Sequence, residues 1–548
     1  MKRFLTNLAA LTALIVLAGC RSEPDSSALG IAGHRPLVVI GIDGATWDVI
    51  DPMIENGELP NLASLKAQGA WGSLITVGPQ VSPVVWTSFS TGQFGRIHGI
   101  LDFVYPYQRG PKRPVQSTER QVPALWNLVS EAGGKVSVVG YFVTYPAEKI
   151  NGVMVSYKST QKQPDADYPA AALVPIREQL DSIFGKEKKT LWSRFLPWDF
   201  DPANPPAEND PAAEAFRMVS GRVKRSILSA EYYRRAALYL AQSPHDLFIS
   251  YFGLVDHTSH SLWKFMDDAD FELKASPESK RLLGNVVQES YRFIDEFIGD
   301  LQARSPVNAN FVIISDHGFG SATGIFSVKK HNKDRLTGNH RPNGIFLAAG
   351  PDIQAGRIDG LTIIDVFPAL AYLSGIAVAD DLPGDLDLRL FTDEILAEHP
   401  PFFTPTYANS GPTVVNATGA SRAAHEDSIK ALQGLGYVGE SFEFGDIDTQ
   451  IFDFWASEHE LLIRHLVGEV SFYLLKGDNE TASTILAEAR SHDDILPPKI
   501  LHRSQVSLRS IRDLIGKQAV PDSAFTFIRS ARFSEAVRFK QNSPGPGE

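Results

Sequence analysis

Seven residues between positions 43 and 340 have side chains that can bind metal ions or act on phosphorus. They are Asp43, Ser82, Asp256, His260, Asp316, His317 and His340, and they lie at the ends of apolar runs. Carboxylates and imidazoles are ligands of hard-to-borderline divalent ions such as zinc or manganese. A bound metal ion lowers the pKa of an oxygen that it touches, so a serine in the same site can attack a phosphate ester as an alkoxide. The set therefore indicates a two-metal phosphate site.

Ser82 opens the segment SPVVWTSFSTG, which ends at Gly92. Proline favours the first position of a helix, serine the cap before it, and glycine the terminator. The sequence therefore predicts that Ser82 caps a helix, where free N–H groups and the helix dipole attract phosphate. A serine that serves only as a cap is the alternative.

Two acidic residues are each followed closely by a histidine. Asp256 and His260 are four residues apart after the apolar run LFISYFG, so one helical turn would point both to the same metal ion. Asp316 and His317 are adjacent after VIIS, where two buried polar groups need partners that a metal ion would supply. The alternative for Asp256 and His260 is that they are two polar residues that share a surface by chance. His340, in GNHRPNG, is a weak signal by itself.

The elements that must position these residues follow an alternating pattern. The apolar runs PLVVIGI, KVSVVGYFVTYP, HDLFISYFG, NFVIISD and GIFLAAG alternate with helical patterns at 123–134 and 284–303. This alternation predicts an α/β sandwich with a mostly parallel central sheet flanked by helices. Functional residues of such sheets gather beyond the carboxyl ends of the strands. Asp43, Asp256 and Asp316 lie at or just past predicted strand ends.

The same sequence pattern also suggests where the domains begin and end. We expect a catalytic domain over 35–440, a helical C-terminal region over 441–540 and a disordered tail over 541–548. Residues 158–225 are rich in Pro, Asp and Ala, with a short helix between two such stretches. They are predicted to be an insertion, and its role as an active-site lid or as a surface excursion stays open. The C-terminal region is predicted to be a plain helical appendage.

The N-terminus has the features of an export signal. Residues 1–20 begin with Lys2 and Arg3, continue with an apolar core and end at Cys20, the only cysteine in the chain. The core is too short to span a bilayer comfortably. Leu-Ala-Gly-Cys resembles the lipobox of bacterial lipoproteins, which implies acylation of Cys20 and a lipid anchor on the periplasmic or outer face of a membrane. Ordinary secretory cleavage is the alternative. Residues 21–34 would be a linker.

The composition of the chain limits the classes of molecule that it is suited to bind. The chain has 548 residues, a formal net charge of −12 and a hydrophobic content of 43%, enough for a large core. An acidic chain is poorly suited to bind nucleic-acid polymers through their backbone. It can still take an anionic phosphate ester, because metal ions supply local positive charge.

The order Asp, Ser, Asp-x-x-x-His, Asp-His, His resembles the alkaline phosphatase superfamily. It is most similar to the type I phosphodiesterases, nucleotide pyrophosphatases and predicted phosphohydrolase/phosphomutase proteins, over roughly residues 36–440. The resemblance implies two divalent metal ions, zinc or manganese, and a phosphoseryl intermediate on Ser82, which would also touch one ion. It implies the following ligand sets: Asp256, His260 and His340 for one ion; Asp43, Asp316 and His317 for the other.

The same resemblance identifies Ser82 by spacing, because the family's nucleophile lies ten residues before the glycine of the helix-ending Thr-Gly pair, here Gly92. Two departures matter. Sulfatases need a proline and an arginine where this chain has Val84 and Trp86. Nucleotide pyrophosphatases have a phosphate-binding Asn where this chain has Phe103, so we expect a bias away from nucleotide diesters.

Three functions compete at this level. The first is a metal-dependent hydrolase of phosphate monoesters or diesters, and the second is a transferase or mutase that passes the phosphoryl group to an alcohol. The third is a lipid-anchored scaffold whose C-terminal helices bind a protein partner. A scaffold has no need to keep six metal ligands, so metal content separates it from the two enzymes.

Overall fold

The computed structural model describes residues 33–105, 113–196, 200–210, 212–324, 336–407, 458–492, 496–515, 520 and 522–531. Cys20 and the predicted tail over 541–548 lie outside these ranges.

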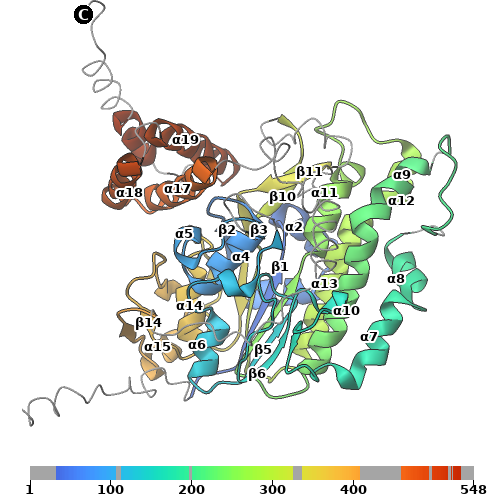
Figure 1. Cartoon of the computed structure of the whole chain (residues 1–548), viewed down its shortest axis with the longest axis horizontal. Helices are drawn as coiled ribbons and strands as arrows, with labels where there is room; N and C mark the ends of the chain where they lie inside the picture. Colours follow the sequence, from blue (N-terminus) through green and yellow to red (C-terminus); the bar gives the residue numbers. More distant parts are fainter. Residues whose placement is uncertain are drawn as a thin grey trace, which may run out of the picture.

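A nine-stranded sheet forms the centre of the molecule (Figure 1). Its order is β13 (Gly356–Arg357), β2 (Ala70–Ile75), β12 (Asn343–Ala349), β9 (Asn310–Ile314), β1 (Leu37–Ile42), β8 (Leu247–Phe252), β5 (Val136–Val139), β6 (Gly152–Val155) and β7 (Asp167–Tyr168). Within the run β9, β1, β8, β5, β6, each strand is parallel to the next. β12 is antiparallel to both β2 and β9, and β7 is antiparallel to β6. The predicted fold class, a mostly parallel sheet flanked by helices, is confirmed.

Helices cover both faces of the sheet (Figure 1). One face packs against α2 (Trp47–Glu55), α3 (Pro60–Gln68), α10 (Lys224–Leu240), α11 (Leu254–Met266) and α13 (Val286–Gln302). The other packs against α4 (Ser82–Thr91), α6 (Leu125–Glu131) and α14 (Val366–Leu373). Within β1, Val38 and Ile40 enter the first core whereas Leu37 and Val39 enter the second. A strand buried on both faces has to be apolar throughout, which explains the uninterrupted runs in the sequence.

Shorter elements complete the catalytic part. They are α5 (Gly95–His98), β3 (Val104–Tyr105), β4 (Arg113–Pro114), α7 (Arg177–Phe184), α8 (Lys188–Phe195), α9 (Ala213–Met218), α12 (Pro277–Leu283), β10 (Gly318–Ser321), β11 (Gly338–Arg341), β14 (Val378–Ala379), α15 (Asp393–Glu398) and β15 (Phe403–Thr404).

Two local predictions are wrong. The run over 135–146 was expected to be one strand, but β5 ends at Val139 because Gly140 takes a positive φ of 72° and turns the chain. The predicted insertion, 158–225, was expected to hold one short helix. It holds α7, α8 and α9 and supplies the edge strand β7.

The C-terminal helices α17 (Glu458–Leu475), α18 (Asn479–His492) and α19 (Leu496–Ile515) form a separate apolar cluster that reaches Ile75 of the sheet. α17 also contacts the catalytic part through Arg96, whose guanidinium donates to both carboxylate oxygens of Glu469 at 2.7 Å. Phe94 packs edge-on against Phe472, with ring centroids 5.2 Å apart. None of the described helices combines the length and the apolar character that a membrane span requires.

Candidate metal and phosphate site

Three aspartates meet at the carboxyl end of three neighbouring strands. Asp43 follows β1, Asp316 follows β9 by two residues, and Asp256 lies in the first turn of α11 after β8. Since β1 is paired with both β8 and β9, the three carboxylates converge. Each has no more than 1% of its surface exposed. Buried acids this close together repel one another unless cations accompany them.

Asp43, Asp316 and His317 form the first cluster. The Nε2 atom of His317 lies 3.3 Å from Asp43 Oδ1 and 3.5 Å from Asp316 Oδ2. These three atoms are buried and have no hydrogen-bond partner among the described residues. The Nδ1 atom of His317 is 3.0 Å from the Gly318 carbonyl oxygen, to which it can only donate. Nε2 therefore keeps a lone pair that faces two carboxylates, which is the donor set of a divalent ion.

Asp256, His260 and His340 form the second cluster. Asp256 and His260 are one turn apart on α11. The Nε2 atom of His260 lies 3.3 Å from Asp256 Oδ1, and the Nε2 atom of His340 lies 3.4 Å from the same oxygen. The two Nε2 atoms are 2.9 Å apart. The Nδ1 atom of His260 is 3.1 Å from the Gly338 carbonyl oxygen, which accepts a hydrogen bond from it. Two ring nitrogens that face each other and a carboxylate also fit a cation.

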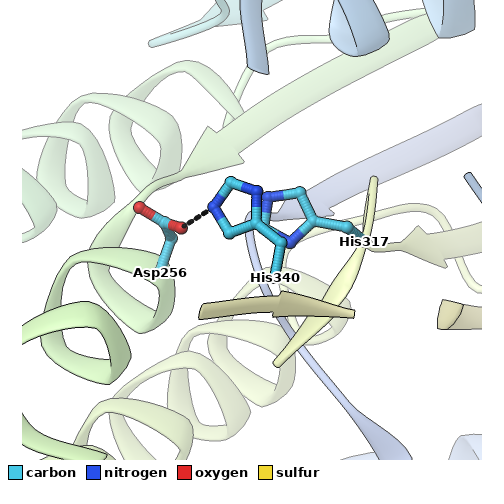
Figure 2. A group of neighbouring side chains, drawn as sticks. All are labelled: Asp256, His317 and His340. Carbon is cyan, nitrogen blue, oxygen red and sulfur yellow. Dashed lines mark ion pairs between the residues drawn. The ribbon is translucent and has the colours of Figure 1, made fainter. Parts of the chain in front are cut away.

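The two clusters are continuous. The rings of His317 and His340 stack with centroids 3.6 Å apart, and Figure 2 shows His340 between Asp256 and His317. Asp256, His317 and His340 also satisfy the geometry of a metal-binding group, so His317 borders both clusters. The two-stranded ribbon of β10 and β11 produces this contact. β10 begins right after His317, and its Phe319 pairs with His340 of β11. This ribbon was not predicted from the sequence.

The electrostatics match ligands of cations. The pKa of Asp43 is raised to about 7, first by burial and second by the charge of Asp256. Burial and the charge of Asp43 raise the pKa of Asp316 as well. Burial alone would raise the pKa of Asp256, but His260 and His340 hold it well below its usual value. Burial lowers the pKa of His260 to about 3 and that of His317 well below normal. The imidazoles of His260 and His317 are therefore neutral, as metal ligation requires.

Ser82 is the first residue of α4, and the prediction that it caps this helix is wrong. The cap position belongs to Val81, and Ser82 makes no capping hydrogen bond. Its Oγ is buried and has no partner among the described residues. Thr87, one turn further on, donates its hydroxyl to the Pro83 carbonyl oxygen at 2.6 Å. Of the two hydroxyls, only that of Ser82 is unused by the helix. Gly92 ends α4 with a positive φ of 67°, as predicted.

Two side chains that sequence reasoning missed connect α4 and β8 to Asp43. Tyr251 donates its hydroxyl to Asp43 Oδ2 at 2.5 Å, and Trp86 donates Nε1 to the same oxygen at 3.3 Å. They leave Oδ1 to face His317. Trp86 lies one turn after Ser82, so the helix that carries the serine also holds a carboxylate of the first cluster. Both aromatic residues lie inside apolar runs, where nothing in the pattern distinguishes them from core residues.

Comparisons with known proteins identify the family of the chain. A family model described as type I phosphodiesterase / nucleotide pyrophosphatase matches residues 37–359, which include all seven candidate residues. No curated protein sequence matches the chain.

Several solved structures are similar to parts of the chain. Phosphonoacetate hydrolase from Sinorhizobium meliloti 1021, in complex with phosphonoformate, is 16% identical over 53% of this chain and 58% of its own, with a TM-score of 0.32. Murine ectonucleotide pyrophosphatase/phosphodiesterase 5 is 12% identical over 65% of this chain and 100% of its own, with a TM-score of 0.39. The 2-O GAG sulfatase BT1596 is 14% identical over 64% of this chain and 73% of its own, with a TM-score of 0.39. Likenesses at this level say nothing about the substrate.

Proposed function

The chain belongs to the type I phosphodiesterase / nucleotide pyrophosphatase family, and from this premise we propose that it hydrolyses phosphate esters through a phosphoseryl intermediate on Ser82 with two divalent metal ions. The family is one of phosphoester hydrolases within the alkaline phosphatase superfamily. The two-metal requirement, the identity of the metal and the role of Ser82 are the proposed part.

One observation carries the proposal: four buried atoms that need partners belong to residues of the predicted site. They are Asp43 Oδ1, Asp316 Oδ2, His317 Nε2 and Ser82 Oγ. An unsatisfied buried polar group costs about 1–3 kcal/mol, more for a charged one, so such a group calls for an explanation. Divalent ions held by the carboxylates and imidazoles would supply the missing partners.

The proposed ligand sets are those of the two clusters. Asp256, His260 and His340 would hold one ion; Asp43, Asp316 and His317 would hold the other, with Ser82 beside it. When bound, two such ions stabilise the negative charge on the entering and leaving oxygens of an in-line displacement. Zinc suits the mixed carboxylate and imidazole ligands, and manganese is the alternative.

The chain's own residues account for the remaining steps. Ser82 Oγ forms a bond to phosphorus while the ester P–O bond breaks and the alcohol leaves. The N-terminus of α4 places positive partial charge next to the transferred phosphoryl group. Water then breaks the Oγ–P bond and releases the phosphate product together with free Ser82. Release to an added alcohol instead of water would make the enzyme a transferase, and product analysis with and without alcohol distinguishes the two.

The experiment is a comparison of Ser82→Ala with Thr87→Val. Loss of a covalent nucleophile removes several orders of magnitude of turnover, so Ser82→Ala is expected to be inactive on nitrophenyl esters while it retains its metal ions. Thr87→Val is expected to keep turnover. Acid trapping of the phosphoenzyme should label the peptide that contains Ser82. A label on Thr87, or a Ser82→Ala variant with near-normal turnover, would overturn the mechanism.

We further propose that the enzyme works at the cell envelope, lipid-anchored through Cys20 on the extracytoplasmic face of a bacterial membrane. The basic start, the short apolar core and Leu-Ala-Gly-Cys support this location. The C-terminal helices are also candidates for binding a protein partner.

A further inference from the structure

A cavity of about 420 Å³ borders the proposed reaction centre. Pro83, the residue after the proposed nucleophile, forms part of its wall, and so does the segment from Tyr251 to Leu254 at the end of β8. Tyr251 is the residue whose hydroxyl binds Asp43. A phosphate ester at Ser82 could therefore place its organic group in this cavity.

Most of the wall is apolar and aromatic. Phe103, Phe142, Phe184 and Tyr233 contribute to it from four separate segments. The ring of Phe142 packs against that of Tyr251 with centroids 5.0 Å apart, which fixes one side of the wall. Phe103 is only 8% exposed and adds apolar surface to this wall. Walls of this kind favour a flat or bulky apolar group.

Three cationic residues also line the cavity, and no Asp or Glu is among the described residues that do so. They are Lys158, Arg222 and Arg225. Lys158 and Arg222 are only 6% and 5% exposed. The charge of Arg222 reaches His257 and His260 and lowers the pKa of both, so Arg222 lies on the side of the metal-ligand clusters. In a chain of net charge −12, this is a local excess of positive charge.

Lys158 lines the cavity next to Tyr157, with its Nζ 5.1 Å from the centre of the Tyr157 ring. Burial lowers the pKa of Lys158 to about 7, because an ammonium group is poorly solvated there. A negatively charged ligand would offset that cost. All three cations belong to the stretch 158–225, which gives this stretch a role in binding rather than in covering the site alone.

We propose that the cavity binds the organic group of the phosphate ester and that this group is a flat apolar body with an anionic substituent of its own. Lys158 is the partner of the second anion, and the aromatic wall contacts the apolar body. The inference rests on the proposed function, since it takes the cavity to receive an ester that reacts at Ser82.

Two diesters with the same 4-nitrophenolate leaving group test the inference. The second ester group, which stays on phosphorus when the nitrophenolate leaves, is phenyl in one diester and 4-carboxyphenyl in the other. For the wild type, kcat/KM is expected to be about tenfold higher for the carboxylated ester, as for a hydrogen bond to a charged group. Equal values, or a preference for the uncharged ester, would overturn the inference.

Variants locate the effect. Lys158→Met is expected to bring the ratio of the two kcat/KM values close to one. Lys162→Met is the matched control, because the side chain of Lys162 is 59% exposed and pairs with Asp181 at 2.8 Å outside the cavity. It should keep the tenfold ratio, and a fall of the ratio in both variants would contradict the assignment of Lys158.

A binding measurement separates failure of this inference from failure of the proposed function. Calorimetry on metal-loaded Ser82→Ala compares phenyl phosphate with 4-carboxyphenyl phosphate, without any turnover. Binding about tenfold tighter for the carboxylated ligand supports the cavity even if neither diester is hydrolysed, in which case only the proposed function fails. Equal binding rejects the cavity even if both diesters are hydrolysed.

Discussion

Asp43 illustrates how neighbours orient one carboxylate. Tyr251 and Trp86 both donate to Oδ2, so Oδ1 is the oxygen that faces His317. Groups that orient a metal ligand are worth about 10–100-fold in metal affinity. The hydroxyl of Tyr251 is the closer of the two donors, and its ring stays packed against Trp86 without it, with centroids 5.0 Å apart.

We therefore expect Tyr251→Phe to weaken metal binding by about 10–100-fold without unfolding the protein. Competition with a chromogenic chelator measures the affinity. Tyr233→Phe is the matched control, because Tyr233 is also buried and lines the same cavity but donates to the Ser156 carbonyl oxygen at 3.3 Å. If both variants bind metal as the wild type does, the Tyr251 hydroxyl does not position Asp43.

Single residues also show where sequence reasoning reaches and where it stops. Asp43 and Asp316 could be placed because a polar residue at the end of a buried strand breaks an apolar run. Tyr251 and Trp86 could not, since their polar atoms are hidden within such runs. The position of His340 in the site depends on the register of the β10–β11 ribbon, and no local sequence pattern specifies that register. Ser82 was predicted to be a cap because its neighbours suit one, but Val81 takes that position and the hydroxyl stays unused.

At the scale of elements, α17 supports the segment that leads to Ser82. A Cβ atom on Gly468 would lie 1.9 Å from the Gly78 carbonyl oxygen, so the helix backbone rests directly on the chain four residues before Ser82. Gly468→Ala must push the two apart. Overpacking of this kind costs about 1–3 kcal/mol.

We expect Gly468→Ala to lower the free energy of unfolding by about that amount and to reduce kcat, because Ser82 shifts with its segment. Chemical denaturation and steady-state kinetics measure the two effects. Thr484→Ala on the exposed face of α18 should change neither. Normal kcat in a destabilised Gly468→Ala variant would show that α17 is only a structural support.

His465 makes the docking of α17 sensitive to pH. It is 2% exposed and shares a hydrogen bond of 3.1 Å with the Leu101 carbonyl oxygen, which accepts from Nε2. Burial lowers its pKa to about 4; the hydrogen bond to Leu101 raises it and the charge of Arg96 lowers it. In the unfolded chain a histidine titrates near 6.5. As the pH falls below 6.5 the unfolded chain takes up the proton first, so stability is lost between about 6.5 and 4.

Comparison with His465→Gln isolates this contribution, because glutamine can still donate to Leu101. Between pH 8 and pH 5 the wild type should lose about 2 kcal/mol more of its unfolding free energy than the variant, roughly 1.4 kcal/mol per pH unit below 6.5. Urea denaturation at several pH values provides the measurement. Parallel pH profiles for the two proteins would contradict the assignment.

At the scale of the whole molecule, the proposed location of the enzyme rests on its N-terminus. We expect residues 1–19 to be absent from the mature protein and Cys20 to be diacylated, since the segment resembles a lipoprotein signal. Mass spectrometry of the mature N-terminus tests this. A Cys20→Ser variant should lose the lipid and leave the membrane fraction. A free thiol at Cys20 in the wild type, or cleavage elsewhere, would remove the anchor from the proposal.

The fold brings three carboxylates and three imidazoles together in its interior, an arrangement that cations would stabilise. Asp43, Asp256 and Asp316 are at most 1% exposed, and the imidazoles of His260 and His317 are neutral. Below a pH of about 7 Asp43 holds a proton in the metal-free protein, because burial raises its pKa to about 7. A metal ion must displace that proton, so metal affinity should weaken as the pH falls below about 7.

Removal of the ions is therefore expected to abolish turnover and to lower the melting temperature. A ligand that binds only the native state at 100 times its Kd stabilises it by about 2.7 kcal/mol, which corresponds to several degrees for a chain of this size. Calorimetry with and without a chelator measures the shift, and re-addition of zinc, manganese or magnesium identifies the ion. Asp316→Asn should reduce the shift, whereas Asp300→Asn, at a carboxylate that is 37% exposed and pairs with Arg234, should leave it unchanged. Gently purified protein without stoichiometric zinc, manganese or iron, and with a melting temperature that the chelator does not alter, would show that the clusters are not metal sites.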